Sequence, residues 1–342
     1  MFGATIALLA LAHGGLSFPS AIFTTASRSP DRLGRHTHIL PVTSRTYVIS
    51  LPRRKDRYLE MERLRTRLGV QWSYISAEDS QSPLVGQIMS RVRSLRREAL
   101  NATDRLPFEW PRTPVSIVPF EDSGPLPLPP PASDDVVPLT CATENITLVP
   151  YSVALPEYKI LSPSRIACWH SHLSAIQRAA SHIPEKPSLV VEDDVDMEVD
   201  IKERLLSVWS LLPPDWDVVF LGHCWSNESY YPALGPPPSP QARLILTHLY
   251  PSRAPLCTHA YALSAAGARR LLLHLTYPRF AYSRAIDHAL AWLVQSGRLK
   301  SFSIVPSIVV QRKIGTSDVM QGKGSKWRDH LVHGVLDGTG LD

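Results

Sequence analysis

The sequence predicts an α/β protein: a mixed, mostly parallel β-sheet flanked by helices in three layers, with proline-rich insertions. Two observations support this prediction. Short apolar, β-branched segments alternate along the chain with segments whose apolar residues recur at spacings of three and four. The chain also opens with a strand, a loop, a helix and a second strand, the kind of unit from which parallel sheets are built. With 342 residues, of which 44% are hydrophobic, it can bury a substantial core.

The first elements follow from β-branched runs and helix breakers. Residues 46–51 form the first predicted strand, which Pro52 closes, and residues 58–68 carry apolar side chains at helical spacing up to Gly69. A short strand over 70–75 and a basic helix over 86–105 follow.

The later elements show the same alternation. A helix starts near Pro163, and its apolar stripe runs from Ile166 to Ile176. Two further helical segments alternate with strands, and a third precedes the last two strands. Strands are predicted over 189–191, 217–222, 243–249, 256–263, 301–304 and 307–311, and helices over 201–212, 265–274 and 286–295.

We expect one main domain, because no repeat and no second core pattern is visible. Many of the 31 prolines lie in two stretches, 107–156 and 232–240, which predicts irregular insertions within that domain. The predicted organisation is a signal peptide or N-terminal membrane anchor over 1–27, a linker over 28–45, the main domain over 46–312 with a proline-rich insertion at about 107–160, and a flexible tail over 313–342.

The N-terminal segment predicts entry into the secretory pathway, either the ER/Golgi lumen or secretion. Residues 2–27 contain no charged residue, and their apolar centre, 6–12, is short for a membrane span. Attachment to a membrane through this segment and its cleavage both stay open. Three glycosylation sequons agree with this routing, at Asn101, Asn145 and Asn227.

Charge and cysteine usage exclude some functions. The net charge of +5 is mild and the arginines are spread out, so no nucleic-acid partner is expected. The four cysteines lack the CxxC spacing of zinc and redox sites. Two disulfides could form but are not required, and Cys168 is expected to be a buried thiol.

The most informative stretch follows the predicted strand 189–191. Apolar residues give way to four carboxylates within five residues, namely Glu192, Asp193, Asp194 and Asp196. Neighbouring carboxylates repel one another, so they favour solvent or a cation. Mn²⁺ or Mg²⁺ takes oxygen ligands and leaves positions for phosphate groups. Taken alone, the cluster is more typical of an acidic surface turn than of a metal site.

A basic loop after the first strand supplies the opposite charge. Arg53, Arg54 and Arg57 lie where open α/β sheets bind anionic ligands, at the carboxyl end of a strand. Arginines at a helix N-terminus oppose the helix dipole, which indicates a role other than stabilising that helix. Arg165 and His172, on the helix near Pro163, are further candidates beside the site; a hydrogen-bonded structural role is the alternative for His172.

Five motifs in order resemble glycosyltransferase family 25, which includes lipopolysaccharide-type and collagen galactosyltransferases. The resemblance covers about residues 46–311. The motifs are YVISLPRRKDR at 47–57, RIACWHSHL at 165–173, LVVEDD at 189–194, AYALSAAGA at 260–268 and IDH at 286–288.

The resemblance implies a GT-A-like (Rossmann-like) fold and transfer of a hexose, most commonly galactose, from a UDP-sugar to a hydroxyl of a glycan or protein, with inversion and a divalent metal. It implies nucleotide-sugar contacts from the arginine loop, Arg165, His172 and Asp193. Metal ligands would be Glu192, Asp194 and Asp196. The triplet 192–194 and the alternative Asp194-Val195-Asp196 both fit, and Asp194 belongs to either.

Inverting transfer needs a base near the acceptor hydroxyl. Asp287 is the candidate, with His288 as a neighbouring metal or nucleotide contact, and a helix N-cap is the alternative role for Asp287. A non-catalytic nucleotide-sugar or metal-binding protein is the main alternative function, and a secreted lectin-like module is another. The acceptor stays open, because pocket shape decides it.

Overall fold

The computed structural model describes residues 40–101, 109–111, 137–143, 146–181, 187–235, 247–312, 318–319 and 330–336. They all belong to one compact unit, Thr37–Asp342. The other unit, Met1–His36, lies outside the described residues, and so does the predicted signal peptide or anchor.

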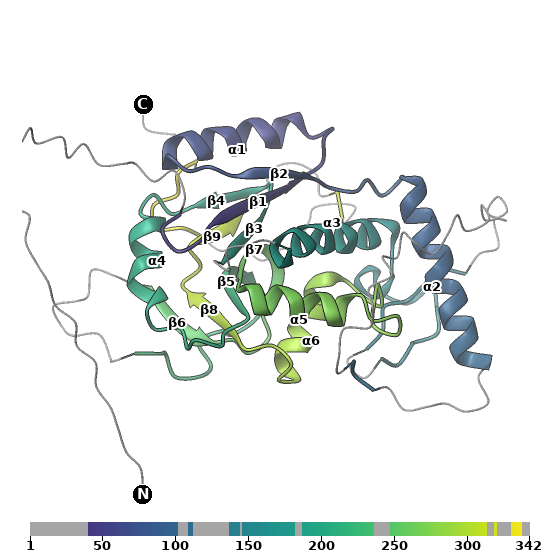
Figure 1. Ribbon diagram of the computed structural model, residues 1–342. Helices are drawn as coiled ribbons and strands as arrows, with labels where there is room; N and C mark the ends of the chain where they lie inside the picture. Colours follow the sequence, from purple (N-terminus) through teal and green to yellow (C-terminus); the bar gives the residue numbers. More distant parts are fainter. Residues whose placement is uncertain are drawn as a thin grey trace, which may run out of the picture. The chain divides into compact units, whose positions relative to one another are not determined.

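Seven strands form the main sheet, in the order β2-β1-β3-β7-β5-β8-β6 (Figure 1). The sheet lies between two groups of helices. Its strands are β1 (Arg45–Ser50), β2 (Ser73–Ser76), β3 (Ser188–Glu192), β5 (Val218–Cys224), β6 (His248–Pro251), β7 (Leu256–Leu263) and β8 (Ser301–Val305).

The sheet is mixed and mostly parallel, which confirms the predicted α/β class. β1 pairs in parallel with both β2 and β3, and β5 pairs in parallel with β8. β7 lies antiparallel between β3 and β5, so these two strands share a direction, and β6 is antiparallel to β8. The carboxyl ends of β1, β3 and β5 therefore meet the start of β7 at one edge of the sheet.

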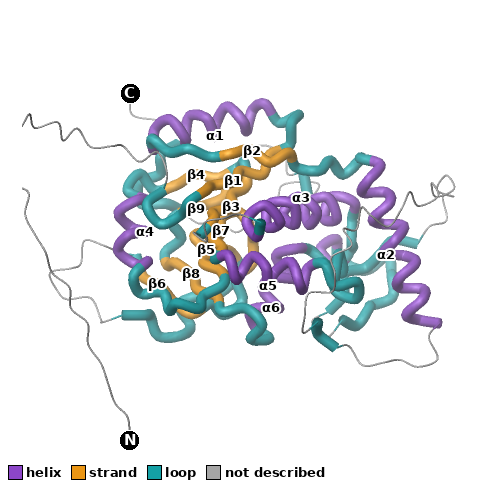
Figure 2. Tube along the Cα trace, viewed as in Figure 1, coloured by secondary structure: helices purple, strands orange, loops and turns teal. Residues whose placement is uncertain are grey.

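Helices cover both faces of the sheet (Figure 2). Along β1, Tyr47 and Ile49 enter one apolar core, while Val48 enters the other, as the alternation of a strand requires. One face carries α2 (Pro83–Asn101), α3 (Pro163–Ala180), α5 (Ala265–Leu275) and α6 (Ile286–Gln295), and the opposite face carries α1 (Lys55–Leu68) and α4 (Ile201–Trp209).

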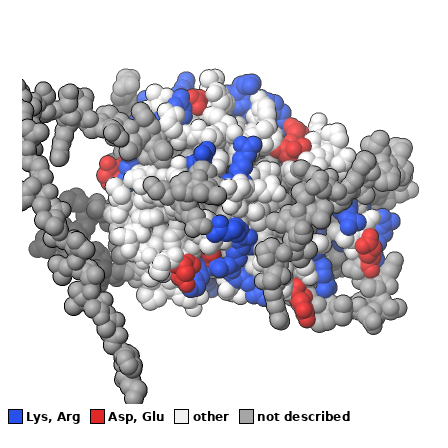
Figure 3. All heavy atoms as spheres, in the orientation of Figure 1, with Lys and Arg blue, Asp and Glu red and all other residues white. Residues whose placement is uncertain are grey.

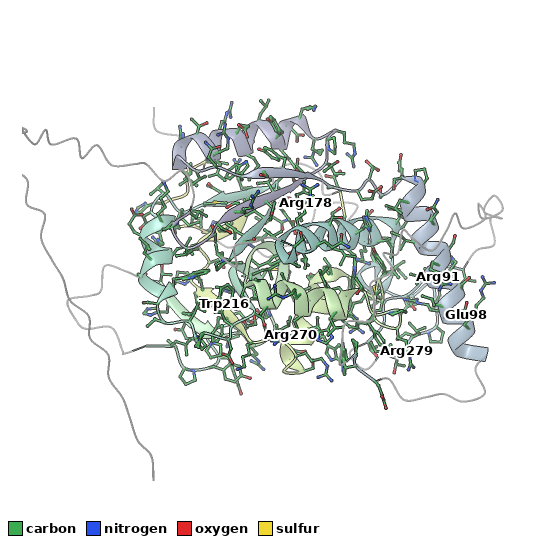
Figure 4. The ribbon with its side chains drawn as sticks, viewed as in Figure 1. Arg91, Glu98, Arg178, Trp216, Arg270 and Arg279 are labelled. Atoms are coloured by element: carbon green, nitrogen blue, oxygen red, sulfur yellow. A yellow bond between two sulfur atoms is a disulfide. The ribbon has the colours of Figure 1, made fainter. Side chains whose placement is uncertain are left out.

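A buried carboxylate fastens α5 to the sheet. Arg270, labelled in Figure 4, pairs with Asp217, which lies directly before β5. Asp217 also accepts the backbone N–H of Lys300, at 2.8 Å. Gly267 lies so close that a Cβ there would stand 2.1 Å from the Asp217 carbonyl oxygen, so this contact between helix and strand needs glycine.

A short strand that the sequence pattern did not predict follows the acidic turn. β4 (Val195–Met197) pairs antiparallel with β9 (Val309–Gln311) in a separate two-stranded sheet. Three residues are too few for a periodicity to be detected. Asp196 is the middle residue of β4 and is 0% exposed.

Part of the proline-rich insertion belongs to the core. Leu139, Thr140 and Ala142 are buried, and the 3₁₀ helix η1 (Glu157–Lys159) leads into α3. Trp110 lies 4.9 Å from the ring of Trp292 and 5.1 Å from that of His274, centroid to centroid. These residues of the insertion therefore pack on α5 and α6 instead of standing apart from the domain.

A segment of the predicted flexible tail is also packed. Val335 and Leu336 are buried in the core under α1 and α4. The backbone N–H groups of Val332 and His333 donate to Glu198, at 2.8 and 2.9 Å. The sequence did not predict this, because Gly, Ser and charged residues dominate around the segment.

Within the described part of the chain, no helix is long and apolar enough to cross a membrane. On the face drawn in Figure 3, Lys and Arg form several separate groups, with Asp and Glu among them.

Candidate active site at the sheet edge

The site lies where two neighbouring parallel strands end. Ile49 of β1 is in register with Glu192 of β3, so the loops after these strands start side by side. One loop carries the arginines and the other the carboxylates. The predicted convergence of opposite charges follows directly from parallel pairing.

Two of the carboxylates meet one arginine. Asp193 accepts hydrogen bonds from the Ser50 hydroxyl at 2.7 Å and from Arg57 at 3.0 Å. Asp194 lies 3.1 Å from the same guanidinium and accepts from the Gln311 amide at 3.2 Å. Arg57 therefore joins the first loop to the acidic turn, and Gln311 joins that turn to β9.

Glu192 has a different set of neighbours. Its Oε1 lies 3.2 Å from Nε2 of His172 and accepts a hydrogen bond from the Thr258 hydroxyl at 3.0 Å. The other ring nitrogen of His172 lies 3.0 Å from the buried Tyr261 hydroxyl. The structure thus places His172 at the site, with its ring held from both sides.

Burial makes the charged forms of two carboxylates in the acidic turn less favourable. Burial, followed by the charge of Glu192, raises the pKa of Asp194 to about 7. Burial also raises the pKa of Asp193. Burial alone would raise the pKa of Glu192, but its hydrogen bond with His172 and the charge of that ring bring it below the usual value. A cation bound beside Asp194 would stabilise its charged form and lower this pKa.

We name the cavity at this edge the arginine cavity; its volume is about 90 Å³. It holds five of the predicted site residues: Arg53, Arg57, His172, Glu192 and Asp193. Ile49, Leu51, Ala77, Glu78, Ser80, Ser164, Ala167, Cys168, Ser171, Asp318 and Val319 complete its lining.

Asp318 stands among the arginines. It lies 2.8 Å from the Arg53 guanidinium, 3.7 Å from that of Arg57, and pairs closely with Arg54. Arg53 also pairs with Asp79 at 2.7 Å. The predicted anion-binding loop is thus formed, with a carboxylate of the chain bound to it.

The charges of Asp287 and of the acidic turn both affect the thiol of Cys168. Burial raises the pKa of this half-buried thiol well above its usual value, and the charges of Glu192, Asp287 and Asp194 raise it further, in that order. The carboxylates of the acidic turn and the carboxylate of Asp287 in α6 therefore all disfavour the thiolate form of Cys168. Asp287 is not the N-cap of α6, which is Ala285; its carboxylate accepts the backbone N–H of His288 at 2.8 Å.

His288 lines a second, larger cavity of about 600 Å³. We name it the aromatic cavity, after the rings of Tyr158, Trp225 and Trp292 in its wall. It lies at the same sheet edge, over the end of β5 and the start of β7.

Two predicted residues have other surroundings. Asp196 is fully buried and accepts the backbone N–H of Met197 at 2.8 Å and that of Leu336 at 3.0 Å. Arg165 is buried and donates to the backbone carbonyls of Glu157 and Ile160. Neither lines the two cavities described here. This placement favours the triplet 192–194 over the triplet that includes Asp196.

Sequence reasoning missed the neutral residues that hold the carboxylates. Ser50, Thr258, Gln311 and Tyr261 all contact the turn or His172. Ser50 and Gln311 are polar residues at the ends of apolar strands, a signal that the sequence does contain. Thr258 lies near the start of β7 and would require the antiparallel direction of this strand to be known.

The carboxylates suit a hard divalent cation in part. Among the described residues, no three His, Cys, Asp or Glu side chains form a ready metal site. Magnesium-like ions, however, are often held by one or two carboxylates together with substrate phosphates. Glu192 and Asp194 fit this role, because both offer oxygen ligands and a cation beside Asp194 would offset the burial and the Glu192 charge that raise its pKa.

Comparison with family models gave no match, and comparison with curated proteins gave none either.

Proposed function

We propose that the protein is a glycosyltransferase that moves a hexose, galactose in the first instance, from a UDP-sugar to a hydroxyl acceptor with inversion. The observation that carries the proposal is the meeting of Arg57 with Asp193 and Asp194 at the carboxyl end of two parallel strands. This is the place where an open α/β sheet binds a nucleotide diphosphate. The motif resemblance and the GT-A-like reading of the fold belong to the same proposal.

Transfer exchanges one bond for another. The acceptor oxygen bonds to the anomeric carbon, the bond from that carbon to the diphosphate breaks, and its electron pair leaves with the nucleoside diphosphate. Arg53 and Arg57 would bind the phosphates, since guanidinium groups match their geometry. A divalent cation on Glu192 and Asp194 would supply Lewis-acid stabilisation of the leaving diphosphate.

The acceptor proton needs a base, and Asp287 is our candidate. Its charge raises the pKa of Cys168, which lines the arginine cavity, and the next residue, His288, lines the aromatic cavity. The hydroxyl proton would pass to its carboxylate as the new bond forms.

One observation favours a second candidate, a nucleotide-sugar-binding protein without catalysis. Arg57 already neutralises part of the charge of Asp193 and Asp194, at 3.0 and 3.1 Å. An arginine in this position can substitute for a metal in a site that only binds.

Substitution of Asp194 distinguishes these candidates. We expect the full chain to bind UDP in the presence of Mn²⁺ and to release sugar from UDP-galactose, or from another member of a nucleotide-sugar panel. Asp194→Asn should lower the turnover by about 100-fold or more, because it removes charge stabilisation of the leaving group. Asp287→Asn should lower turnover by a similar factor and leave UDP binding unchanged.

Asp215→Asn is the matched control, since Asp215 is exposed and its ion-pair partner among the described residues is Lys300. Binding of UDP with Mn²⁺ but no transfer from any donor supports the second candidate. If no nucleoside diphosphate stabilises the protein, both candidates fail. Normal turnover in Asp287→Asn with loss in Asp194→Asn would show that the base is another group.

A further inference from the structure

The aromatic cavity is large enough for a ligand of its own. Its volume of about 600 Å³ lies within the range of small-molecule sites, whereas the arginine cavity holds about 90 Å³. Its lining comes from the loop after β5, the segment that leads into β7, the whole length of α6 with the two residues before it, and the last part of the insertion. The lining residues are Cys141, Ala142, Thr143, Val149, Tyr158, Lys159, Trp225, Ser226, Asn227, Arg253, Ala254, Leu256, Arg284, Ala285, His288, Ala291, Trp292 and Gln295.

The charge of this lining is one-sided. Lys159, Arg253 and Arg284 contribute three cations from three separate segments. No Asp or Glu belongs to the lining among the residues that the structure describes. Concave surfaces lined by one sign of charge concentrate ligands of the opposite sign.

The cations differ in how firmly they are held. The guanidinium of Arg284 is buried and lies 5.3 Å from the ring centre of Phe280 and 5.1 Å from that of Trp292. Arg253 is exposed and lies over the Tyr230 ring, at 4.0 Å. The cavity therefore has one buried cation, Arg284, that the surrounding rings hold in place. Its exposed cations, Arg253 and Lys159, can change rotamer to meet a ligand.

Its aromatic rings offer flat apolar surface. Trp225 is 54% exposed and Tyr158 is 56% exposed, which is unusual for side chains of this size. Rings with a polar edge and an apolar face suit ligands that are themselves amphipathic, such as sugar rings.

Unusual backbone surrounds the cavity. Within the described residues, four non-glycine residues have positive φ: Ile146 (64°), Trp225 (54°), Cys257 (64°) and Tyr282 (50°). Each lies in the lining or within three residues of it. A disulfide joins Cys224, directly before Trp225, to Cys257. Such conformations cost free energy and concentrate at binding sites, so their grouping here indicates that this cavity is a ligand-binding site.

The cavity opens beside the proposed chemistry. Leu256 lines it, and Thr258, two residues further along β7, hydrogen-bonds to Glu192 at 3.0 Å. His288 lines it as well, next to the proposed base Asp287.

We infer that the aromatic cavity binds a carbohydrate that carries an anionic group, and that this carbohydrate is the acceptor. The sugar ring would lie against Trp225, and its anionic group would meet Lys159, Arg253 and Arg284. The role as acceptor rests on the proposed glycosyltransferase function; the binding of an anionic sugar does not.

Binding of matched disaccharides to the full chain tests this inference without requiring transfer. The probes end in glucuronic acid, in glucose 6-phosphate or in glucose, and tryptophan fluorescence and ligand-observed NMR report binding. We expect at least one anionic probe to bind about tenfold more tightly than the neutral one, because charge-assisted hydrogen bonds are the stronger ones. The carboxylate and phosphate probes identify which anion the cavity takes.

Two variants and one control locate the site. Arg253→Gln and Lys159→Gln should each weaken the anionic probe severalfold and leave the neutral probe unchanged. Arg178→Gln is the control, since Arg178 is exposed in the last turn of α3, away from the cavity lining (Figure 4). Circular dichroism checks that all three variants fold.

The outcomes separate this inference from the proposed function. Equal affinity for anionic and neutral probes overturns the inference, whether or not the protein binds UDP. Displacement of the anionic probe by UDP, together with weaker UDP binding in Arg253→Gln, also overturns it, because the cavity would then be the donor site. Binding of an anionic probe by a protein that binds no UDP supports the cavity as a sugar site and removes the proposed function.

Discussion

Asp318 is the residue whose contacts bear most directly on ligand binding. Its carboxylate lines the arginine cavity and contacts Arg53 and Arg54 in the loop after β1 and Arg57 in the first turn of α1. A diphosphate would need the same guanidinium groups. Asp318 therefore competes with any anionic ligand of the loop, much as a bound anion would.

Removing this carboxylate should tighten the binding of UDP. We expect Asp318→Asn to lower the dissociation constant of UDP by about three- to tenfold, because the arginines no longer lose an ion pair on binding. Isothermal titration calorimetry of the full chain, at low and at high salt, measures the effect. Asp79→Asn is the comparison, since within the described part of the chain Asp79 forms an ion pair with one of these arginines, Arg53, at 2.7 Å. Unchanged or weaker UDP binding in Asp318→Asn would show that the phosphates do not use these arginines.

At the same scale, the acidic turn shows which part of a site a sequence can reveal. Charged residues such as Arg57 and Asp194 stand out in the sequence, and parallel pairing brings them together. Asp196 stands out equally, but the unpredicted strand β4 turns it into the interior. Asp196 accepts hydrogen bonds from two backbone N–H groups, one of them that of Leu336. No local sequence pattern can predict this contact across 140 residues.

At the scale of elements, α5 joins the sheet to the proline-rich insertion. His274, in the last turn of this helix, is buried and meets the edge of Trp110. Burial, followed by the charges of Arg298 and Arg270, lowers the pKa of His274 to about 4. The imidazole is therefore neutral in the folded protein at neutral pH.

This histidine should make stability depend on pH. The folded pKa of about 4 lies below the unfolded value of about 6.5, so the unfolded chain binds more protons between these values. Stability therefore falls as pH drops from 6.5 towards 4, and the loss is about 1 kcal/mol at pH 5.5. His274→Phe keeps the ring contact with Trp110 and removes the titration.

Denaturant unfolding of the wild type and of His274→Phe at pH 7.5 and 5.5 measures this contribution as a difference of differences. We expect the variant to lose about 1 kcal/mol less between the two pH values. An equal loss in both proteins would mean that His274 is protonated in the folded state or reaches water.

Elements with a clear period were predictable here, and those fixed by distant contacts were not. The helix from Pro163 and the strand 217–222 follow from apolar spacing, and the structure confirms both as α3 and β5. The direction of β7 and the partial burial of Trp110 depend on partners far along the chain. Proline-rich segments give no period at all, so the sequence could not show that parts of the insertion enter the core.

At the scale of the whole molecule, the last described segment closes the fold. Residues 330–336 add Val335 and Leu336 to one core, and Arg67 of α1 donates to the Val335 carbonyl at 2.9 Å. Backbone N–H groups of this segment donate hydrogen bonds to two buried carboxylates. Leu336 donates to Asp196, and residues 332 and 333 donate to Glu198. The C-terminal segment thus supports β4, which continues directly from Asp194.

Removal of this C-terminal segment should therefore weaken ligand binding at the acidic turn. A chain that ends at residue 329 leaves Asp196 and Glu198 without these donors, and an unsatisfied buried carboxylate costs about 1–3 kcal/mol or more. We expect the free energy of unfolding to fall by about 3 kcal/mol and the Mn²⁺-dependent binding of UDP to weaken, because Asp194 loses its support. A chain that ends at residue 336 keeps every one of these contacts and is the control. Unfolding at the same temperature for both truncated chains would show that the segment does not stabilise the fold, whereas lost stability with full UDP affinity would separate the acidic turn from β4.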